Sequence, residues 1–302
     1  MKKILITGAT GFIGTHLIPE LIKNYKIVGI SKNKIKPSKN FTSSNVDITN
    51  EKLKIKNKYT DIIHMAAYSD VTYCNLNPTK CYELNVKSTQ KMLEIARKKD
   101  SNFIFLSSSH VYGNPIKQPI LENSVGTPST HYASSKKMSE ILCETYSKTY
   151  GLNIQIARLF SVYGPRSPKS NLIFNIIDQI TNNSKIILGN TYPKRDFIFV
   201  SDVITGLIKI LNSKKKGFQV YNIGSGKSIS VDEVVKNCFT ISNKKLKIIS
   251  SKEKRRKNEI MDIQANISKM KKEFNWKTEI SLKKGLEMTY NYYVSKTLIK
   301  KF

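Results

Sequence analysis

The first residues of the chain place glycines directly after an apolar, β-rich run. Residues 3–7 (KILIT) have the pattern of a buried strand, and residues 7–14 (TGATGFIG) follow at once and open a helix that runs to about Leu21. Glycines at this spacing allow a tight turn, a close approach of the backbone to a pyrophosphate, and packing of the helix on the strand. A glycine triplet alone is equally typical of a plain turn. Its place between the first strand and the first helix favours a dinucleotide site.

Further β-rich runs alternate with amphipathic stretches through the first half of the chain. Strands are predicted at residues 26–30, 61–65, 102–106 and 153–158, and helices at residues 77–98 and 131–150. Such alternation indicates right-handed crossovers in an α/β fold, a Rossmann doubly wound parallel sheet. Beyond Gly164 the pattern loosens. We therefore predict a Rossmann domain of residues 1–165, to which residues 196–224 return, and a smaller C-terminal substrate-binding α/β region of residues 166–195 and 225–302.

The charge of the chain raises the question of an anionic partner. Its 302 residues include 51 Lys and Arg against 22 Asp and Glu, a net charge of +29, whereas 39% hydrophobic residues exclude global disorder. The basic residues are scattered, and lysine accompanies a heavy use of Asn and Ile, so we interpret the excess as compositional bias. We predict no nucleic-acid partner.

The cysteines and the apolar runs indicate where the protein works. No C-x-x-C pair or His/Cys cluster is present, which predicts free thiols, no metal site and a cytoplasmic location. The cysteines are Cys74, Cys81, Cys143 and Cys238. No apolar run approaches the roughly 18–20 residues of a membrane-spanning helix, so no membrane partner is expected.

The end of the second predicted strand bears on the choice of cofactor. NAD-binding proteins usually carry an acidic residue there, which bonds the adenosine ribose hydroxyls. Here the strand ends in Ser31 followed by Lys32. A hydroxyl and a cation suit a 2′-phosphate better than a bare ribose, so NADP is favoured over NAD. The alternative is that Lys32 is one more surface lysine.

A tyrosine and a lysine lie one helical turn apart in the predicted helix 131–150. A phenol with an ordinary pKa near 10 is a poor acid–base catalyst at neutral pH unless a cation stabilises its phenolate. Lys136 stands four residues after Tyr132 and would supply that cation. Ser108 follows a predicted strand and could hold a substrate oxygen. This combination predicts Ser108, Tyr132 and Lys136 as catalytic residues. His110, nearby, either contacts substrate or packs in its loop.

These elements resemble, in order and spacing, the extended short-chain dehydrogenase/reductases that modify nucleotide sugars, the epimerase, dehydratase and 4-ketoreductase group. Further segments in register resemble motifs of that family. They are residues 61–67 (DIIHMAA), 85–89 (NVKST), 158–165 (RLFSVYGP), 195–203 (RDFIFVSDV) and 221–226 (YNIGSG). The resemblance covers nearly the whole chain and implies an NAD(P)-dependent oxidoreductase acting on a nucleotide-diphosphate sugar, in a homodimer.

The resemblance also implies roles for individual residues. The cofactor would be bound by Gly8, Gly11, Phe12, Ile13, Gly14, Ser31, Lys32, Asp47, Ile48, Ala66, Ala67 and Asn85, together with Tyr132 and Lys136. Among these, Asp47 and Ile48 would lie at the adenine. The substrate would be bound by Ser109, His110, Ser161, Asn171 and Arg195, and by one of Arg255 and Arg256. The arginines would bind the diphosphate. The alternative for Arg255 and Arg256 is a solvated face, which is the less favoured interpretation.

Three reactions are known in the family: dehydration, epimerisation and reduction of a keto sugar. The residues argue against the first and bear less strongly on the choice between the other two. Dehydratases carry an Asp-Glu pair after the catalytic hydroxyl, whereas this chain has Ser109 and His110. Residues 66–71 (AAYSDV) resemble a segment of dTDP-4-dehydrorhamnose reductases. With Ser31 and Lys32 they predict an NADP-dependent reduction of a 4-keto (6-deoxy) sugar nucleotide. The alternative is a UDP-hexose 4-epimerase with tightly bound NAD, which Arg195 and its motif favour.

Overall fold

The computed structural model describes residues 1–33, 35–50, 53, 55–255 and 259–299. The chain forms two compact units, treated separately below. The first comprises Met1–Gly113, Val125–Leu159 and Ile204–Asn222, and the second comprises Asn114–Ser124, Phe160–Val203 and Ile223–Phe302. The cofactor and substrate roles predicted for the two parts of the chain stay predictions, because the division into units does not assign them.

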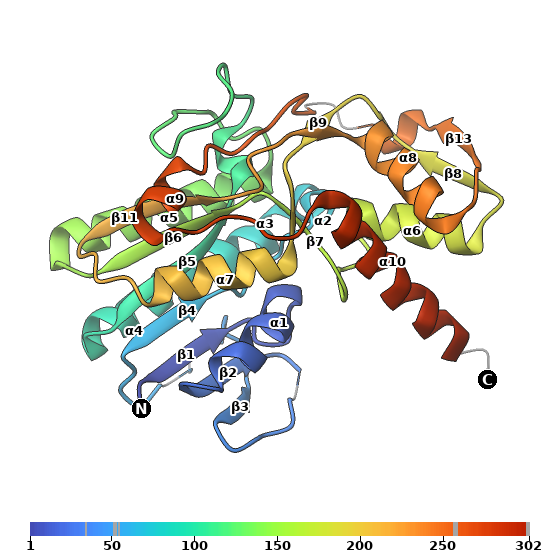
Figure 1. Cartoon of the computed structure of the whole chain (residues 1–302). Coiled ribbons are helices and arrows are strands. Elements are labelled where there is room, and N and C mark those ends of the chain that lie inside the picture. The colour runs from blue at the N-terminus through green and yellow to red at the C-terminus, as the bar shows by residue number, and fades with distance from the viewer. Residues whose placement is uncertain (34, 51–52, 54, 256–258, 300–302) are drawn as a thin grey trace. The chain divides into compact units, whose positions relative to one another are not determined.

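The first unit is built on a seven-stranded sheet (Figure 1). Its strands are β1 (Lys3–Thr7), β2 (Lys26–Ser31), β3 (Phe41–Asn45), β4 (Asp61–His64), β5 (Asn102–Ser108), β6 (Ile154–Leu159) and β11 (Phe218–Ile223). Their spatial order is β11-β6-β5-β4-β1-β2-β3, and the pairs from β3 to β6 are parallel. The order reverses between β1 and β4, and ligands of open parallel sheets bind at the carboxyl ends beside such a reversal. The predicted Rossmann fold is confirmed.

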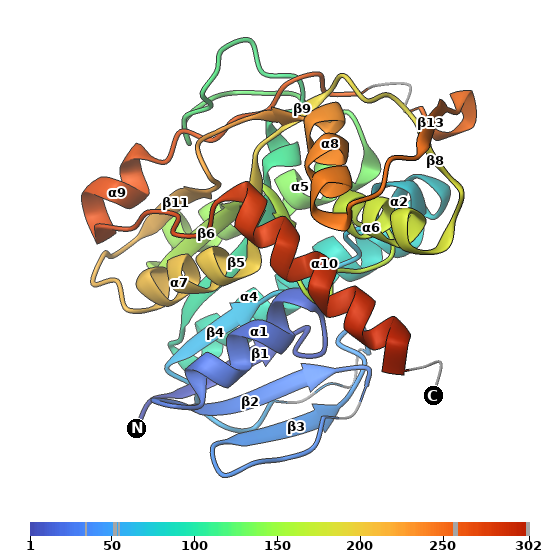
Figure 2. The same ribbon diagram turned by 45° about the vertical axis from the view of Figure 1, so that its right-hand side comes forward.

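Helices cover both faces of this sheet. They are α1 (Phe12–Leu21), α2 (Val71–Leu76), α3 (Pro78–Tyr82), α4 (Ser88–Lys99), α5 (His131–Tyr150) and α7 (Val200–Leu211), whose first residues belong to the second unit. In Figure 2, α1 and α7 lie on one face of the sheet and α4 and α5 on the other. Two short turns complete the connections, a π-helical turn (Glu83–Lys87) before α4 and a 3-10 turn (Ser109–Tyr112) after β5.

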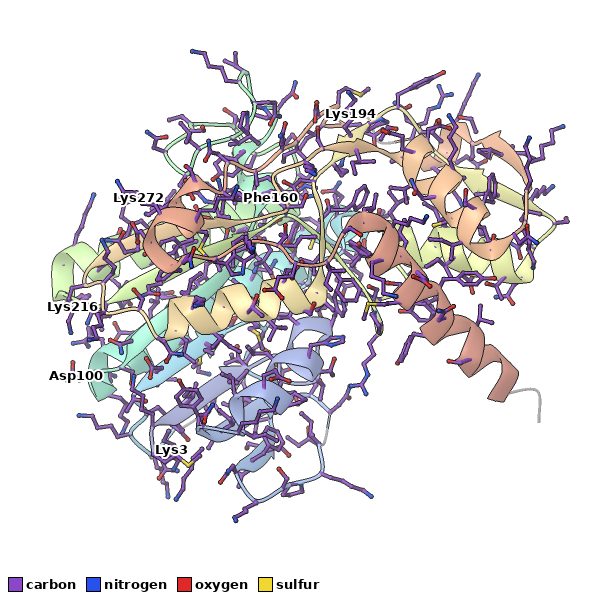
Figure 3. All side chains as sticks on the ribbon, in the orientation of Figure 1. Lys3, Asp100, Phe160, Lys194, Lys216 and Lys272 are labelled. Atoms are coloured by element: carbon purple, nitrogen blue, oxygen red, sulfur yellow. The ribbon has the colours of Figure 1, made fainter. Side chains whose placement is uncertain are left out.

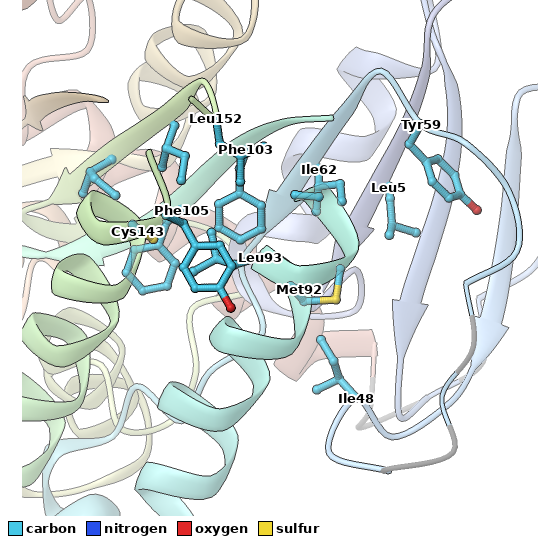
Figure 4. Packing of buried hydrophobic residues seen from close by; sticks show 14 of the residues in the cluster. Leu5, Ile48, Tyr59, Ile62, Met92, Leu93, Phe103, Phe105, Cys143 and Leu152 are labelled. Carbon is cyan, nitrogen blue, oxygen red and sulfur yellow. The ribbon is translucent and has the colours of Figure 1, made fainter. Parts of the chain in front are cut away.

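The core of the first unit forms between the sheet and its helices. Leu5 of β1 and Phe103 of β5 belong to one buried cluster with Met92 and Leu93 of α4 and Cys143 of α5, and none of these side chains is exposed (Figure 4). Each large apolar side chain buried in this way contributes roughly 1.5–3 kcal/mol. Because strand and helix residues share this core, the carboxyl ends of the strands are held in fixed positions relative to α4 and α5.

Two elements of the first unit differ from the prediction. The predicted helix 77–98 is interrupted by the π-helical turn, which separates α3 from α4. The wider turn carries Asn85, whose buried side chain reaches α5. The strand β3 was not predicted, because FTSSN is polar and alternates weakly; it pairs with β2 at the edge of the sheet.

The second unit consists of short paired strands and helices. Its strands are β7 (Ser161–Tyr163), β8 (Lys185–Leu188), β9 (Lys194–Arg195), β10 (Phe197–Phe199), β12 (Ile229–Ser230) and β13 (Lys247–Ser250), paired β10–β7, β12–β9 and β13–β8. Its helices are α6 (Leu172–Asn182), α8 (Val231–Ser242), α9 (Ser268–Phe274) and α10 (Leu282–Ile299), with a 3-10 turn at Lys252–Lys254. Ser230 and Glu233 form a reciprocal capping box that begins α8.

The lysine excess lies largely at the periphery of both units. Lys216 in the first unit and Lys194 and Lys272 in the second are exposed (Figure 3). This distribution agrees with the interpretation of the charge as solvated surface. Across the part of the chain that the structure describes, no helix combines the length and the hydropathy needed to cross a membrane. The cytoplasmic location and the homodimer stay predictions.

Candidate active site

The glycine turn after β1 has no room for side chains at Gly8 and Gly14, and we call this turn the glycine cradle. Gly8 has a φ of +71°, and a Cβ there would lie 2.8 Å from the Ala66 backbone nitrogen. At Gly14 a Cβ would lie 2.5 Å from the Ala9 carbonyl oxygen. Gly11 is the N-cap of α1 and offers no side chain to the free amide groups of the first turn, which contains Phe12 and Ile13. Open backbone at a helix N-terminus fits a dinucleotide pyrophosphate.

Lys32 at the end of β2 is paired with an acid. Its Nζ lies 2.9 Å from Asp47 Oδ2, and this hydrogen bond raises the pKa of Lys32. Burial alone would raise the pKa of Asp47, but hydrogen bonds from Thr49 and Lys32 outweigh it and lower that pKa. Ser31 donates its hydroxyl proton to the Asn33 carbonyl at 2.6 Å. Ser31 and Lys32, which the sequence analysis placed at a 2′-phosphate, thus both have hydrogen-bond partners within the protein.

A cavity of about 470 Å³ adjoins this region in the first unit. It is lined by Ile48, Thr49, Glu83, Lys87, Ser88 and Lys91. Ile48, which the family resemblance places at the adenine, is 4% exposed and forms part of the wall. Ala66 lies on the other side of the glycine turn and donates its backbone N–H to Thr7, and Ala67 follows it in the same loop.

The three predicted catalytic residues come together in the first unit. Ser108 is the last residue of β5, and Tyr132 and Lys136 lie one turn apart on α5, which begins with Thr130 capping the Ala133 amide at 3.1 Å. Ser108 and Tyr132 share a side-chain hydrogen bond. Lys136 Nζ donates to the Leu106 carbonyl at 2.7 Å and lies 4.7 Å from the centre of the Phe105 ring.

The protonation of this group differs from the prediction. Burial raises the pKa of Tyr132 to about 12, against the opposite effect of its hydrogen bond with Ser108. Burial also lowers the pKa of Lys136 to about 8, against the opposing charge of Glu140. We predicted that Lys136 would lower the pKa of Tyr132. In the structure the lysine is turned to the Leu106 carbonyl, so it does not offset the cost of burying the phenolate.

The residues that follow Ser108 lie against the tyrosine. Ser109 is 4% exposed and opens the 3-10 turn after β5. The rings of His110 and Tyr132 meet edge to face with their centres 5.7 Å apart. His110 therefore packs on the catalytic side chain, and its predicted contact with substrate stays a prediction.

A buried histidine connects the glycine turn to the helices behind it, and the sequence had not indicated it. Thr7 Oγ1 accepts hydrogen bonds from the Met65 and Ala66 amides, so its own proton goes to His64 Nδ1, 2.7 Å away. His64 Nε2 must then carry the ring proton, and it donates to Thr89 Oγ1 at 3.1 Å. These hydrogen bonds fix one neutral tautomer of His64.

The chain of hydrogen bonds continues to the catalytic helix. Thr89 donates to the Asn85 carbonyl at 2.6 Å, and the Asn85 side chain donates to Ser135 Oγ at 2.8 Å. Ser135 in turn donates to the Tyr132 carbonyl at 2.8 Å. Asn85 is 1% exposed and also bonds the Tyr68 amide, so its observed contacts position α5 relative to the loop after β4. Its predicted contact with the cofactor stays a prediction.

The histidine makes stability depend on pH with a definite sign. Burial, followed by the charge of Lys136, lowers the pKa of His64 from 6.5 to about 3. An unfolded chain takes up a proton below pH 6.5 that the folded chain does not, so stability falls as the pH drops from 6.5 toward 3. We expect wild type to lose about 3 kcal/mol more than His64→Gln between neutral pH and about pH 4.5. Urea unfolding at both pH values measures the difference.

A second histidine provides the matched control for this experiment. His131 is exposed at the start of α5 and hydrogen-bonds Tyr82 at 3.0 Å. His131→Gln reports the effect of exchanging a histidine for glutamine outside the core. If His64→Gln retained the full acid sensitivity of wild type, the assignment of that sensitivity to His64 would be wrong.

A buried ion pair supports the catalytic helix from the other side. Arg158 on β6 makes a bidentate contact with Glu140, with Nε 2.9 Å and Nη2 2.7 Å from the carboxylate oxygens. Arg158 Nη1 donates to Tyr112 Oη at 2.8 Å, and that hydroxyl donates to Asn222 Oδ1 at 2.6 Å. Glu140 lies one turn after Lys136 on α5. These motif residues thus join β6, β11 and α5 behind the catalytic group.

The arginines predicted to grip the diphosphate lie in the second unit. Arg195 on β9 is 14% exposed, and its Nη2 lies 3.5 Å from Glu259 Oε1. Arg255 is exposed and donates to Ser250 Oγ at 3.0 Å. Arg256 lies outside the residues that the structure describes. The phosphate contacts of Arg195 and Arg255 stay predictions.

The other predicted substrate residues of the second unit have structural contacts. Asn171 caps α6 by accepting from the Ile173 and Phe174 amides, and its side-chain nitrogen donates to the Val162 carbonyl at 2.9 Å. Ser161 begins β7, and its amide donates to the Asp196 carbonyl at 2.9 Å. Binding of substrate by Ser161 and Asn171 also stays a prediction.

Asp196, which follows Arg195, was not among the predicted site residues, and in the structure it connects two segments of the second unit. Asp196 is fully buried and accepts from the Ser225 hydroxyl at 2.7 Å, from the Gly226 amide at 2.9 Å and from the Ala265 amide at 3.0 Å. Burial raises the pKa of Asp196, and these hydrogen bonds act against it. The acid binds the turn after β11 to the segment before α9 and so holds β9 in place.

The family of the chain follows from comparison with known proteins. A model described as the NAD dependent epimerase/dehydratase family matches residues 4–224. The chain belongs to this family. Its resemblance to the extended short-chain dehydrogenase/reductases is thereby confirmed, and of the two cofactors left open by the prediction of an NAD(P)-dependent enzyme, the family description names NAD.

Members of the epimerase/dehydratase family match along nearly the whole chain. A putative UDP-glucose 4-epimerase of Methanocaldococcus jannaschii is 34% identical over 96% of this chain and 97% of its own length. A UDP-glucuronate 4-epimerase of Thermodesulfobacterium geofontis is 33% identical over 97% and 96%. The solved structure of a UDP-glucuronic acid 4-epimerase from Bacillus cereus with UDP-glucuronic acid and NAD is 30% identical, covers 97% of this chain and 99% of its own, and superposes with a TM-score of 0.90.

These relatives change two of the expectations drawn from the sequence. They are 4-epimerases rather than 4-ketoreductases, and the solved relative contains NAD. The preference for NADP therefore has no support, in keeping with the pairing of Lys32 to Asp47. Across the described residues no cluster of three or more His, Cys, Asp or Glu side chains could hold a metal ion.

Proposed function

We propose that this family member is a UDP-hexose 4-epimerase that keeps NAD bound through its catalytic cycle. The observation that carries the proposal is the hydrogen bond between Ser108 and Tyr132, one turn from Lys136, in the unit that holds the glycine cradle. The 4-epimerases among the relatives support this reaction. The ion pair between Lys32 and Asp47 supports NAD as the cofactor, because the lysine charge is already balanced by the carboxylate.

The proposed reaction inverts a sugar carbon by oxidation and renewed reduction. NAD, held at the glycine turn after β1, would supply the hydride-acceptor and hydride-donor chemistry of this reaction. Ser108 holds the sugar oxygen, and Tyr132 removes its proton during oxidation and gives it back on reduction. Lys136, one turn after Tyr132, is positively charged below its pKa of about 8, and it supports the phenolate form of the tyrosine in this cycle only when it turns from the Leu106 carbonyl to the phenol oxygen.

Two residues of the segment 66–71, which resembles a reductase segment, make structural hydrogen bonds. Tyr68 is bonded through its amide and carbonyl to the Asn85 side chain, at 2.8 and 3.0 Å. Asp70 is the N-cap of α2 and accepts from the Tyr73 amide at 3.0 Å. These contacts give Tyr68 and Asp70 structural roles that do not depend on whether the enzyme is a reductase or an epimerase.

The test separates the two reactions by their need for external hydride. Purified protein is incubated with UDP-glucose, UDP-glucuronic acid or UDP-N-acetylglucosamine without added cofactor, and the sugars are analysed by NMR. We expect a mixture of C4 epimers from at least one substrate and NAD in the denatured protein. Steady consumption of added NADPH by a 4-keto sugar nucleotide, with no epimer formed, would overturn the proposal in favour of the reductase.

The pair at the end of β2 gives a prediction on cofactor choice. Asp47→Asn removes the negative partner of Lys32 and leaves its cation free for a 2′-phosphate. We expect the ratio of NADPH to NADH affinity to rise by about tenfold, a difference of about 1.4 kcal/mol. Titration of apoprotein with each reduced cofactor, followed by fluorescence, measures both affinities.

The double variant Lys32→Met/Asp47→Asn is the control. It lacks the cation, so the gain in NADPH affinity should disappear while the change at Asp47 remains. An equal gain in both variants would show that Lys32 does not discriminate between the cofactors.

A further inference from the structure

Two buried cysteine sulfurs meet beneath a surface layer of short helices. Cys74 on α2 and Cys81 on α3 are both fully buried, and their Sγ atoms lie 2.7 Å apart. A disulfide bond is about 2.05 Å long, so closing this contact requires the sulfurs to approach by only about 0.7 Å. Cys143 and Cys238 are also buried, free cysteines.

The cysteine pair belongs to the surroundings of the catalytic tyrosine. Cys74, Cys81 and Tyr132 form one buried cluster. Cys81 Sγ lies 3.5 Å from the Asn85 side-chain nitrogen and 3.7 Å from Ser135 Oγ. Since Asn85 and Ser135 hold the first turn of α5, a change at Cys81 reaches the turn that carries Tyr132.

We propose that Cys74 and Cys81 are a reversible dithiol–disulfide modification site in contact with the catalytic helix. This proposal goes beyond the epimerase reaction, and its chemistry does not depend on it. The oxidant is a hydroperoxide, which accepts two electrons. One thiolate attacks a peroxide oxygen and becomes a sulfenic acid as hydroxide or alkoxide leaves, and the second sulfur then attacks the first with release of water. The balance is two thiols and one peroxide giving one disulfide, one water and one further water or alcohol.

The contacts distinguish the two sulfurs. The Asn85 side-chain N–H donates to Cys81 Sγ at 3.5 Å, whereas Cys74 Sγ lies 3.8 Å from the Tyr68 carbonyl oxygen. Burial, and next the neighbouring Cys81, raise the pKa of the Cys74 thiol, so Cys74 stays protonated. Cys81 is therefore the attacking sulfur and Cys74 resolves the sulfenic acid.

Access to the pair requires local opening of the layer above it. That layer consists of α2 and α3, which have six and five residues, and Leu76 at its turn is 76% exposed. Elements this short open at a small fraction of the free energy of global unfolding. A small peroxide can thus reach Cys81, while the longer helices α5 and α8 shield Cys143 and Cys238.

Closing the bond is expected to disturb catalysis. The sulfenic acid and then the disulfide replace the free sulfur that accepts from Asn85, and the sulfur of Cys81 is drawn toward Cys74. A displacement of about 1 Å near reacting groups can cost about a hundredfold in rate. For the smaller movement here we expect at least about a fivefold loss of turnover, restored by dithiothreitol.

Peptide mass spectrometry tests the modification without reference to activity. The whole protein is treated with hydrogen peroxide, alkylated under denaturing conditions and digested. We expect one cross-link joining Cys74 to Cys81, a mass lower by about 2 Da, and full alkylation of Cys143 and Cys238. If all four thiols remain alkylated, or if Cys143 or Cys238 reacts equally, the proposal is wrong.

Variants test the link to catalysis. Cys74→Ala should abolish both the cross-link and the dithiothreitol-reversible loss of turnover, whereas Cys238→Ala should behave as wild type. A cross-link that leaves turnover unchanged would refute the coupling to Tyr132. If the proposed epimerase activity is absent, the reduced protein will already be inactive, and the mass experiment on wild type still decides the modification.

Discussion

Replacing Tyr132 by phenylalanine is expected to lower the turnover of sugar nucleotide by about a hundredfold to ten-thousandfold, the usual contribution of a positioned acid–base group. The substitution removes only the hydroxyl that bonds Ser108 and keeps the ring that packs against His110. Bound NAD should therefore remain at wild-type stoichiometry. Steady-state rates of C4 inversion, with cofactor content measured on the same samples, give both quantities.

A second tyrosine on the same helix serves as the matched control. Tyr146 donates its hydroxyl to Glu94 at 2.8 Å, away from the catalytic turn of α5. Tyr146→Phe also removes one hydroxyl from α5, and we expect it to turn over substrate at the wild-type rate. A Tyr132→Phe protein that retains more than about a tenth of wild-type activity is incompatible with the proposed mechanism.

The sequence predicted the elements whose patterns are strong and local. The bounds of the predicted helix 131–150 agree with α5, because Thr130 caps its start and Gly151, in the left-handed conformation, follows its end. The glycine turn was predicted because the close approaches at Gly8 and Gly14 require the absence of a side chain. These features are encoded by a few neighbouring residues.

Features that depend on distant partners could not be predicted in the same way. Lys32 was assigned to a phosphate from its place after β2, since nothing local showed that β3 would bring Asp47 within 2.9 Å of it. The pKa of Tyr132 was expected to fall beside Lys136, but the direction was decided by burial and by the Leu106 carbonyl. Both predictions judged charges without their surroundings.

Family motifs do not indicate which contacts their residues make in the fold. Arg158 and Asn222 lie in segments that resemble family motifs, and Tyr112 follows the predicted catalytic Ser108 by four residues, yet no motif indicates that they hydrogen-bond one another. These side chains are buried together in the fold, and the sequence alone does not show this. A buried arginine must have an acid, and only the fold shows that the acid is Glu140, one turn beyond Lys136.

The buried pair leads to a prediction about stability. Arg158→Met should lower the free energy of unfolding by about 3–5 kcal/mol, because it leaves the Glu140 carboxylate buried without its partner. The double variant Glu140→Gln/Arg158→Met buries no unpaired charge, so it should be more stable than Arg158→Met although it carries one more substitution. Urea unfolding of wild type, both single variants and the double variant closes the cycle.

An exposed pair on the same helix shows what burial contributes to this effect. Lys148 Nζ and Glu144 Oε1 are 2.7 Å apart, as are Arg158 Nη2 and Glu140 Oε2. The lysine and glutamate side chains are 73% and 44% exposed, however, against 7% and 5% for the arginine and glutamate of the buried pair. Lys148→Met leaves a solvated carboxylate and should barely change stability. A double variant no more stable than Arg158→Met would mean that lost packing, rather than an unpaired charge, causes the destabilisation.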